Sequence, residues 1–149
     1  MKRYYEDYKI GKKIITPGRT VTEADVSILM GICRYSEPLM IDEEYAKTTK
    51  FGKRIVPGRV TLAIAGGLVV LGKIFDDDTT ICGVGIRNVK FVSPLLVGDT
   101  IRLEVEFIEK RETSKEGVGL VTHREICKNQ RGETVLEVEE THMVRLRPV

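Results

Sequence analysis

The chain has no tryptophan, two histidines and three cysteines in 149 residues. Cys33, Cys82 and Cys127 are odd in number and far apart, which argues against a disulfide framework and for reduced thiols. No Cys-x-x-Cys pair or cluster of histidines indicates a zinc site. We therefore expect a cytoplasmic protein that holds no metal and no other cofactor.

Long apolar runs and a strong charge of one sign are also missing. The longest apolar run, residues 60–70, is too short to span a bilayer, and the N-terminus lacks the apolar core of a signal peptide. The net charge of +2 is nearly balanced, and no basic cluster is interleaved with aromatic residues. We expect neither a membrane nor a nucleic acid as a partner.

What the chain does have is the composition of a soluble globular protein, 42% hydrophobic and 31% charged. No repeat, low-complexity tract or linker divides it. At this length a single domain, spanning residues 1–149, can bury a core of its own.

The first half of the chain predicts helices. Thr22 is a good N-cap, and the apolar spacing after it is typical of a helix that ends near residues 34–36, ahead of Pro38. Asp42 can cap a second, short helix over residues 43–48. A loop over residues 52–57 then precedes a longer helix.

This longer helix, residues 60–75, is apolar on every side, which predicts burial on all faces. Gly66 and Gly67 each cost a helix about 1 kcal/mol relative to alanine, so something approaches closely there. A ligand or another backbone would explain them, and tight packing on a sheet is the simpler interpretation.

The second half predicts antiparallel strands over residues 80–92, 101–109, 118–128 and 134–146. Gly83 and Gly85 suggest bulges in the first strand, and residues 110–116 read as a charged hairpin loop. His123 and His142 fall within strands, and we interpret each as a partly buried sheet residue. Helices followed by long strands indicate an α+β fold, with an antiparallel sheet wrapped around the central helix.

Short motifs add a family resemblance that extends from about Tyr8 to Val144. They read Thr20-Val-Thr-Glu-Ala-Asp25, Glu37-Pro-Leu-Met-Ile-Asp42, Phe51-Gly-Lys-Arg-Ile-Val-Pro-Gly58 and Val89-Lys-Phe-Val-Ser-Pro-Leu-Leu-Val-Gly-Asp99. In this order and spacing they resemble the MaoC-like (R)-specific enoyl-thioester hydratases and dehydratases. The resemblance implies a hotdog fold, a homodimer or higher homo-oligomer, and acyl sites at the subunit interface.

The same resemblance places unusual residues at the family's acid–base positions. Tyr35 stands where the family has its catalytic Asp, Met40 where it has its catalytic His, and Pro57 where it has the His before the second Gly. Methionine and proline cannot transfer a proton. Gly58 keeps the position whose backbone N–H, at a helix start, helps to bind the thioester carbonyl.

We therefore expect a protein that binds acyl-CoA or acyl-carrier-protein thioesters, from a family of hydro-lyases in fatty-acid metabolism, without the usual dyad. The expected substrate-binding residues are Gly58, Arg59, Arg54 and Met40. Arg59 could place a positive charge near the thioester carbonyl or a carboxylated acyl group, or it could point outward.

Two alternatives remain open. In the first, the chain is an active hydratase, dehydratase or thioesterase that uses Glu37 as base and Tyr35 as hydrogen-bond donor. The simpler interpretation of Glu37 is that it pairs with Arg59 or Arg54 and only fixes the loop. In the second alternative, the chain is a non-catalytic partner subunit of an intact homologue.

Overall fold

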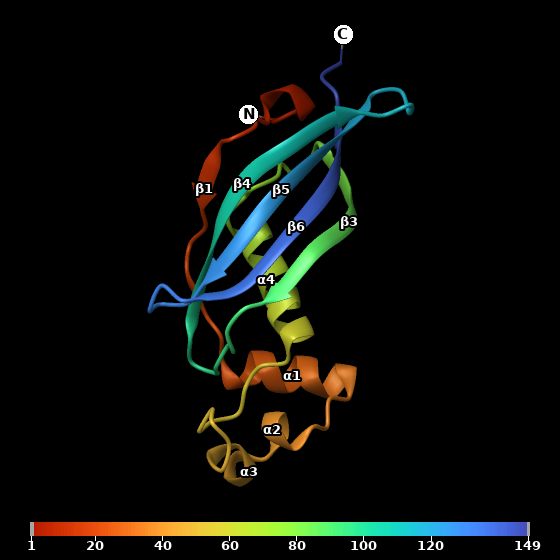
Figure 1. Ribbon diagram of the computed structural model, residues 1–149. Helices are drawn as coiled ribbons and strands as arrows, with labels where there is room; N and C mark the ends of the chain where they lie inside the picture. The colour runs from red at the N-terminus through yellow and green to blue at the C-terminus, as the bar shows by residue number, and fades with distance from the viewer. Residues whose placement is uncertain (1, 149) are drawn as a thin grey trace.

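Four long strands from the second half of the chain form most of the sheet (Figure 1). They are β3 (Thr80–Phe91), β4 (Thr100–Glu112), β5 (Val118–Lys128) and β6 (Thr134–Arg145). The computed structural model describes residues 2–148. With the short β1 (Lys13–Ile15), the strands form an antiparallel sheet in the order β1-β4-β5-β6-β3, and β2 (Arg19–Thr20) also pairs with β4.

The strands follow their predicted patterns closely. The alternating apolar residues of β4 are buried on one face, and they are Ile101, Leu103, Val105 and Phe107. The register of β3 against β6 shifts between Gly83 and Gly85, which confirms a bulge there. The predicted hairpin loop at 110–116 is too long, because residues 110–112 continue the pairing of β4 with β5.

The helices in the first half begin where the capping residues predict. Thr22 caps α1 (Glu23–Cys33), with Asp25 bonding back to it, and Asp42 caps α3 (Glu43–Lys47). Two helical elements were not predicted, the single turn α2 (Pro38–Ile41) and the 3₁₀ turn η1 (Tyr5–Asp7). Helices α1, α2 and α3 lie together beyond one end of the sheet, next to the start of α4 (Figure 1).

Helix α4 (Gly58–Leu71) lies against one face of the sheet (Figure 1). Its inner face contributes Ile64, Ala65 and Leu68 to the core. The prediction of burial on all faces is wrong for the single chain, because Val70 and Leu71 are 70% and 51% exposed. The sheet covers one side of the helix, and within residues 2–148 nothing encloses the end of the opposite side.

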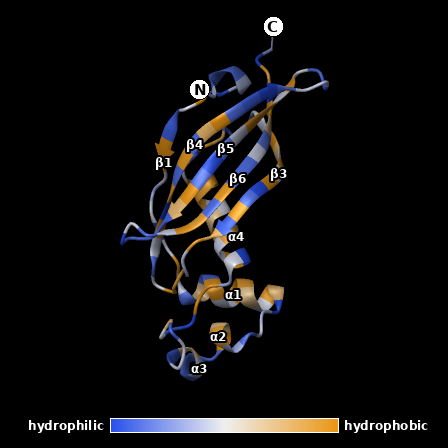
Figure 2. Ribbon diagram, viewed as in Figure 1, coloured by the Kyte–Doolittle hydropathy of each residue, from blue (hydrophilic) through white to orange (hydrophobic). Residues whose placement is uncertain are grey.

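Apolar side chains are also exposed on two other elements. Hydrophobic colouring runs along α1 and α2 at the end of the sheet in Figure 2, and Ile28 and Ile32 of α1 are exposed. The edge strand β3 exposes Ile86 and Phe91. Among the described residues, no helix combines the length and the apolar character needed to cross a bilayer.

Candidate functional site

The N-terminal turn of α4 lies directly against the end of β3. A Cβ on Gly58 would lie 2.9 Å from ring atoms of Phe91, so a larger residue fits there only if the ring moves. Pro57 precedes Gly58 and has no side-chain group that could cap the helix. The first backbone N–H groups of a helix lack intrahelical acceptors and carry partial positive charge, so this turn is suited to bind an oxygen ligand.

Two pockets flank this turn. The first, of about 370 Å³, includes Lys50, Phe51, Gly58 and Phe91 in its lining. The second, of about 310 Å³, lies between α4 and strands β3, β5 and β6. Gly58 lines the first pocket and the adjacent Arg59 lines the second, so both pockets border the first turn of α4.

The second pocket combines a helix wall of small residues with an acidic sheet wall. Arg59, Ala63 and Gly66 line it from α4, and Glu125 and Glu140 line it from β5 and β6. Apart from its chain neighbours and the backbone of its own helix, a Cβ at Gly66 would meet no atom of residues 2–148 within 4 Å. The interpretation of tight packing is therefore wrong at Gly66, where the missing side chain leaves the pocket open.

Tyr35, Glu37 and Met40 lie in the segment that joins α1 to α2 and in α2 itself. Tyr35 and Met40 are half-buried and pack against the core. Glu37 is exposed, and its carboxylate accepts a hydrogen bond from the backbone N–H of Ser36 at 3.2 Å. In the described part of the chain, no hydrogen bond joins Glu37 to Tyr35.

Arg54 has different partners from those expected. Its guanidinium donates to Glu43 at 2.8 Å and to Glu23 at 2.9 Å, and these hydrogen bonds raise the pKa of Arg54. Neither pair expected for Glu37, with Arg54 or with Arg59, is formed among the described residues. Glu23 and Glu43 lie in the first turns of α1 and α3, so Arg54 ties the loop before α4 to both helices. Arg59 is exposed at the pocket.

A polar cluster that the sequence analysis missed lies where β5 and β6 pair. His123 and Glu125 are two residues apart on β5, Glu140 and His142 are two apart on β6, and His123 pairs with Glu140 in the register. Alternation therefore places all four side chains on one face of the sheet. The sequence contains His-x-Glu in one strand and Glu-x-His in the next. This pattern predicts a cluster only once the register of the two strands is known.

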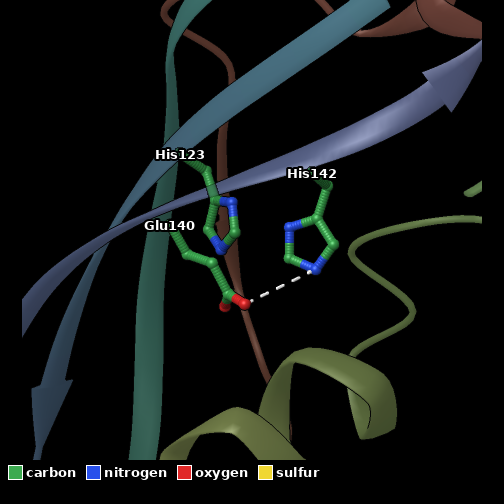
Figure 3. Close-up of side chains that lie close together, drawn as sticks. All are labelled: His123, Glu140 and His142. Atoms are coloured by element: carbon green, nitrogen blue, oxygen red, sulfur yellow. Dashed lines mark ion pairs between the residues drawn. The ribbon is translucent and has the colours of Figure 1, made fainter. Parts of the chain in front are cut away.

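Figure 3 shows three of these four side chains, His123, Glu140 and His142, close together. Nε2 of His123 lies 2.7 Å from Oε1 of Glu125, and their side chains are 0% and 2% exposed. Nε2 of His142 lies 3.7 Å from Oε1 of Glu140. Phe75 covers both imidazoles, with ring centroids 5.1 Å from His123 and 4.3 Å from His142.

Burial shifts the pKa values of His142 and Glu140. It lowers the pKa of His142 to about 4, and the neighbouring His123 adds to the effect. Burial also raises the pKa of Glu140, together with the charge of Glu125, while His123 acts in the opposite direction. At neutral pH, His142 is therefore a neutral imidazole with a lone pair available.

Comparison with known proteins confirms the resemblance. The family model described as MaoC like domain matches residues 7–129. An (R)-specific enoyl-CoA hydratase from Rhodospirillum rubrum is 30% identical over 148 residues, which cover 97% of this chain and 93% of that protein. Protein MaoC from Klebsiella aerogenes is 33% identical over 117 residues, 76% of this chain. The match covers 32% of Protein MaoC, so this chain spans about a third of that relative's length.

Solved structures show the same fold. The monoamine oxidase regulatory protein from Archaeoglobus fulgius is 38% identical, with a TM-score of 0.90 over 99% of this chain and 97% of that one. Rv0216 from Mycobacterium tuberculosis, described as a double hotdog fold, has a TM-score of 0.84 at 21% identity, over 99% of this chain and 45% of that one. The predicted hotdog fold is thereby confirmed, and the chain belongs to the family of proteins with a MaoC-like domain.

Proposed function

We propose that this chain binds an acyl thioester of coenzyme A or of an acyl-carrier protein at the first turn of α4. The observation that carries the proposal is the position of Gly58, at an uncapped helix start that borders two pockets. The helix N-terminus would hold the carbonyl oxygen, because unpaired N–H groups and the helix dipole both favour negative charge. The named activity of the Rhodospirillum rubrum relative, on an enoyl-CoA, supports this ligand class.

The pockets on either side of Gly58 suggest how the ligand would lie. The pocket at Arg59 and Gly66 is the proposed acyl site, because the glycine leaves its wall open. The pocket at Gly58 includes Lys50, whose ammonium suits the phosphates of a coenzyme A or carrier arm. The carbonyl would then lie at the turn that both pockets border.

Hydration of the bound thioester would need acid–base groups beside the carbonyl site. Hydration needs a base for water and an acid for the α-carbon, and the positions of the family dyad hold Tyr35 and Met40. We propose that the chain binds the thioester but does not hydrate it, since the Asp and His of the family are both replaced. Glu37 with Tyr35 is the alternative pair, and the absence of a hydrogen bond between them in residues 2–148 favours binding alone.

We also propose that the chain works as a homodimer or a higher homo-oligomer in a reducing cytoplasm. Exposed apolar side chains on α4 and on the edge strand β3 support self-association, because a second copy would remove this surface from water. They are Val70, Leu71, Ile86 and Phe91. The three cysteines are free thiols, as the reducing compartment would require. Light scattering after size-exclusion chromatography should give at least twice 16.8 kDa, and a monomer at micromolar concentration would contradict the proposal.

The first experiment titrates the purified protein with saturated acyl-CoAs of several chain lengths and follows heat release and thermal stability. Binding should need the acyl group, so coenzyme A without one should bind more weakly. The binding proposal fails if no acyl-CoA and no acyl-carrier protein changes either measurement.

A second experiment tests turnover. Crotonyl-CoA at high protein concentration should keep its conjugated absorbance if the chain only binds. If the absorbance falls, Glu37→Gln should abolish the reaction, and Glu44→Gln, an exposed glutamate of α3, is the matched control. Turnover that survives Glu37→Gln would eliminate Glu37 as the base.

A further inference from the structure

The two histidines of the chain, which are 19 residues apart in sequence, meet on one face of the sheet. Figure 3 shows the imidazoles of His123 and His142 facing each other, with the carboxylate of Glu140 below them. The ring centroids are 5.5 Å apart. One potential ligand atom from each of the three residues lies within 4.8 Å of the others.

The contact between His142 and Glu140 is too long for a hydrogen bond, and its length is close to that between two ligands of one metal ion. Nε2 of His142 and Oε1 of Glu140 are 3.7 Å apart, beyond the range of a hydrogen bond. Two ligands that each lie about 2.1 Å from a tetrahedral ion are about 3.4 Å apart. A small shift of either side chain would therefore bring both atoms to one ion.

One ring nitrogen of His123 is already held by a carboxylate, and the other has no partner in residues 2–148. Its Nε2 is hydrogen-bonded to the buried carboxylate of Glu125, which leaves Nδ1 as the nitrogen available to an ion. Nδ1 of His123 and Nδ1 of His142 are both buried, and neither has a hydrogen-bond partner within residues 2–148. A histidine that ligates a metal commonly donates its other N–H to a carboxylate, the arrangement that His123 makes with Glu125.

The neighbouring strand leaves room beside the cluster. Gly83 of β3 pairs with His142, and a Cβ at Gly83 would lie 3.0 Å from Oε1 of Glu140 and 3.7 Å from Nε2 of His142. Unlike His123, both Glu140 and His142 are partly exposed, and Glu140 also lines the pocket at Arg59. An ion could therefore enter from that pocket.

We propose that His123, His142 and Glu140 bind one divalent transition-metal ion, with Glu125 orienting His123. Two imidazoles and one carboxylate form the ligand set of catalytic His₂Glu zinc sites and of non-haem iron(II) sites. Such a set favours Zn²⁺, Fe²⁺, Co²⁺ or Ni²⁺ over Mg²⁺, which prefers oxygen ligands. Three protein ligands leave a coordination position open. This inference does not depend on thioester binding.

The test uses the full chain without a histidine tag, stripped with a chelator and then dialysed. Titration with Co²⁺ should produce visible absorption and about one bound ion per chain by mass spectrometry of the metal. Zn²⁺ and Ni²⁺ should raise the melting temperature, and Mg²⁺ should not. Less than about a tenth of an ion per chain with all three transition metals would overturn the proposal.

Variants locate the ion. His142→Asn and Glu140→Gln should each weaken Co²⁺ binding at least about 10-fold, and Glu125→Gln should weaken it less. Glu137→Gln is the matched control, because Glu137 lies on the same strand with its side chain on the opposite face. Binding by His142→Asn and Glu140→Gln that equals the control would also overturn the proposal.

Gly83→Ala tests the site in a protein that keeps every ligand, so that weaker binding does not have to reflect a failure to fold. It removes no ligand but places a methyl group beside Glu140 and His142. Circular dichroism should remain that of the wild type, while Co²⁺ affinity falls. Unchanged affinity in a folded Gly83→Ala protein would place the ion elsewhere.

Discussion

The ring of Phe91 covers Gly58 so closely that a Cβ on Gly58 would lie 2.9 Å from three of its carbons. Phe91 is the last residue of β3, and Gly58 is the first residue of α4. The end of the edge strand therefore determines how closely the helix N-terminus can approach, and with it the position of the proposed carbonyl site.

Gly58→Ala should weaken acyl-CoA binding, because the new methyl group must displace the Phe91 ring or the helix start. We expect a loss of about 1 kcal/mol in the free energy of unfolding, since the ring is half exposed and can move. Urea unfolding and calorimetric titration would measure the two effects. The double variant Gly58→Ala/Phe91→Leu should recover part of the lost acyl-CoA affinity and part of the lost unfolding free energy. No recovery in the double variant would contradict the steric explanation.

Gly66→Leu should block the proposed acyl pocket without harming the fold. Outside the backbone of its own helix and its chain neighbours, no atom of residues 2–148 lies within 4 Å of a Cβ at Gly66. Leucine is also a better helix former than glycine by roughly 0.5–1 kcal/mol. Long-chain acyl-CoAs should bind at least about 10-fold more weakly, a loss of about 1.4 kcal/mol, and short ones should be less affected.

The control for this change is Gly31→Leu in α1, where a Cβ also meets no atom within 4 Å. Gly31 does not line the pocket between α4 and the sheet. Equal weakening of long and short acyl chains by Gly66→Leu, or equal weakening by Gly31→Leu, would contradict the assignment of the acyl site.

Asp99 should stabilise the protein in a pH-dependent way. Its nearly buried carboxylate accepts hydrogen bonds from Arg131 at 2.9 Å, Gln130 at 2.9 Å and the backbone N–H of Leu96 at 3.1 Å. Burial alone would raise the pKa of Asp99, but these hydrogen bonds outweigh it and lower the pKa below 3.8. The stabilisation is therefore complete above the unfolded pKa and is lost as pH falls through the lower folded pKa.

Asp99→Asn should cost about 1–3 kcal/mol of unfolding free energy at pH 7. The difference from wild type should narrow as pH falls below about 4, because the wild-type carboxyl is then protonated. Urea unfolding of both proteins at several pH values measures this. A difference that stays constant down to pH 3 would show that charge on Asp99 plays no part.

Cys127 should be unreactive in the folded protein. It is fully buried, and burial raises the pKa of its thiol to about 12, with the charge of Glu125 adding to the effect. Because the thiolate is the reactive form, a disulfide reagent at pH 8 should label Cys33, which is exposed, and spare Cys127 until urea is added. Peptide mass spectrometry in a Cys82→Ser background would show this, and equal labelling of Cys33 and Cys127 without urea would refute it.

Local sequence patterns were enough to predict much of this fold. The strand predicted over residues 118–128 is the observed β5, and Thr22 and Asp42 cap helices where expected. These features depend on neighbours in the chain: a cap bonds to a backbone N–H three residues away, and a strand face repeats every two residues. The short strands β1 and β2 were missed because their partners lie in β4, about 80 or more residues away.

The candidate site also has a part that the sequence predicted and a part that it did not. Gly58 and Arg59 could be identified from a contiguous motif, and both lie at the helix start that borders the pockets. The partners of Arg54 could not be identified from the sequence, because Glu23 and Glu43 come from two separate helices. The open space at Gly66 was also beyond prediction, since it depends on what the sheet places opposite the helix.

The sequence by itself determined the family, the order of the elements and the apolar face of each long strand. Only the tertiary structure decided that His123 lies opposite Glu140, and so that four polar side chains form one cluster. The physical reason is the register. A one-residue shift between β5 and β6 would change which residues lie opposite each other, and that shift depends on the turn and the packing of the whole sheet.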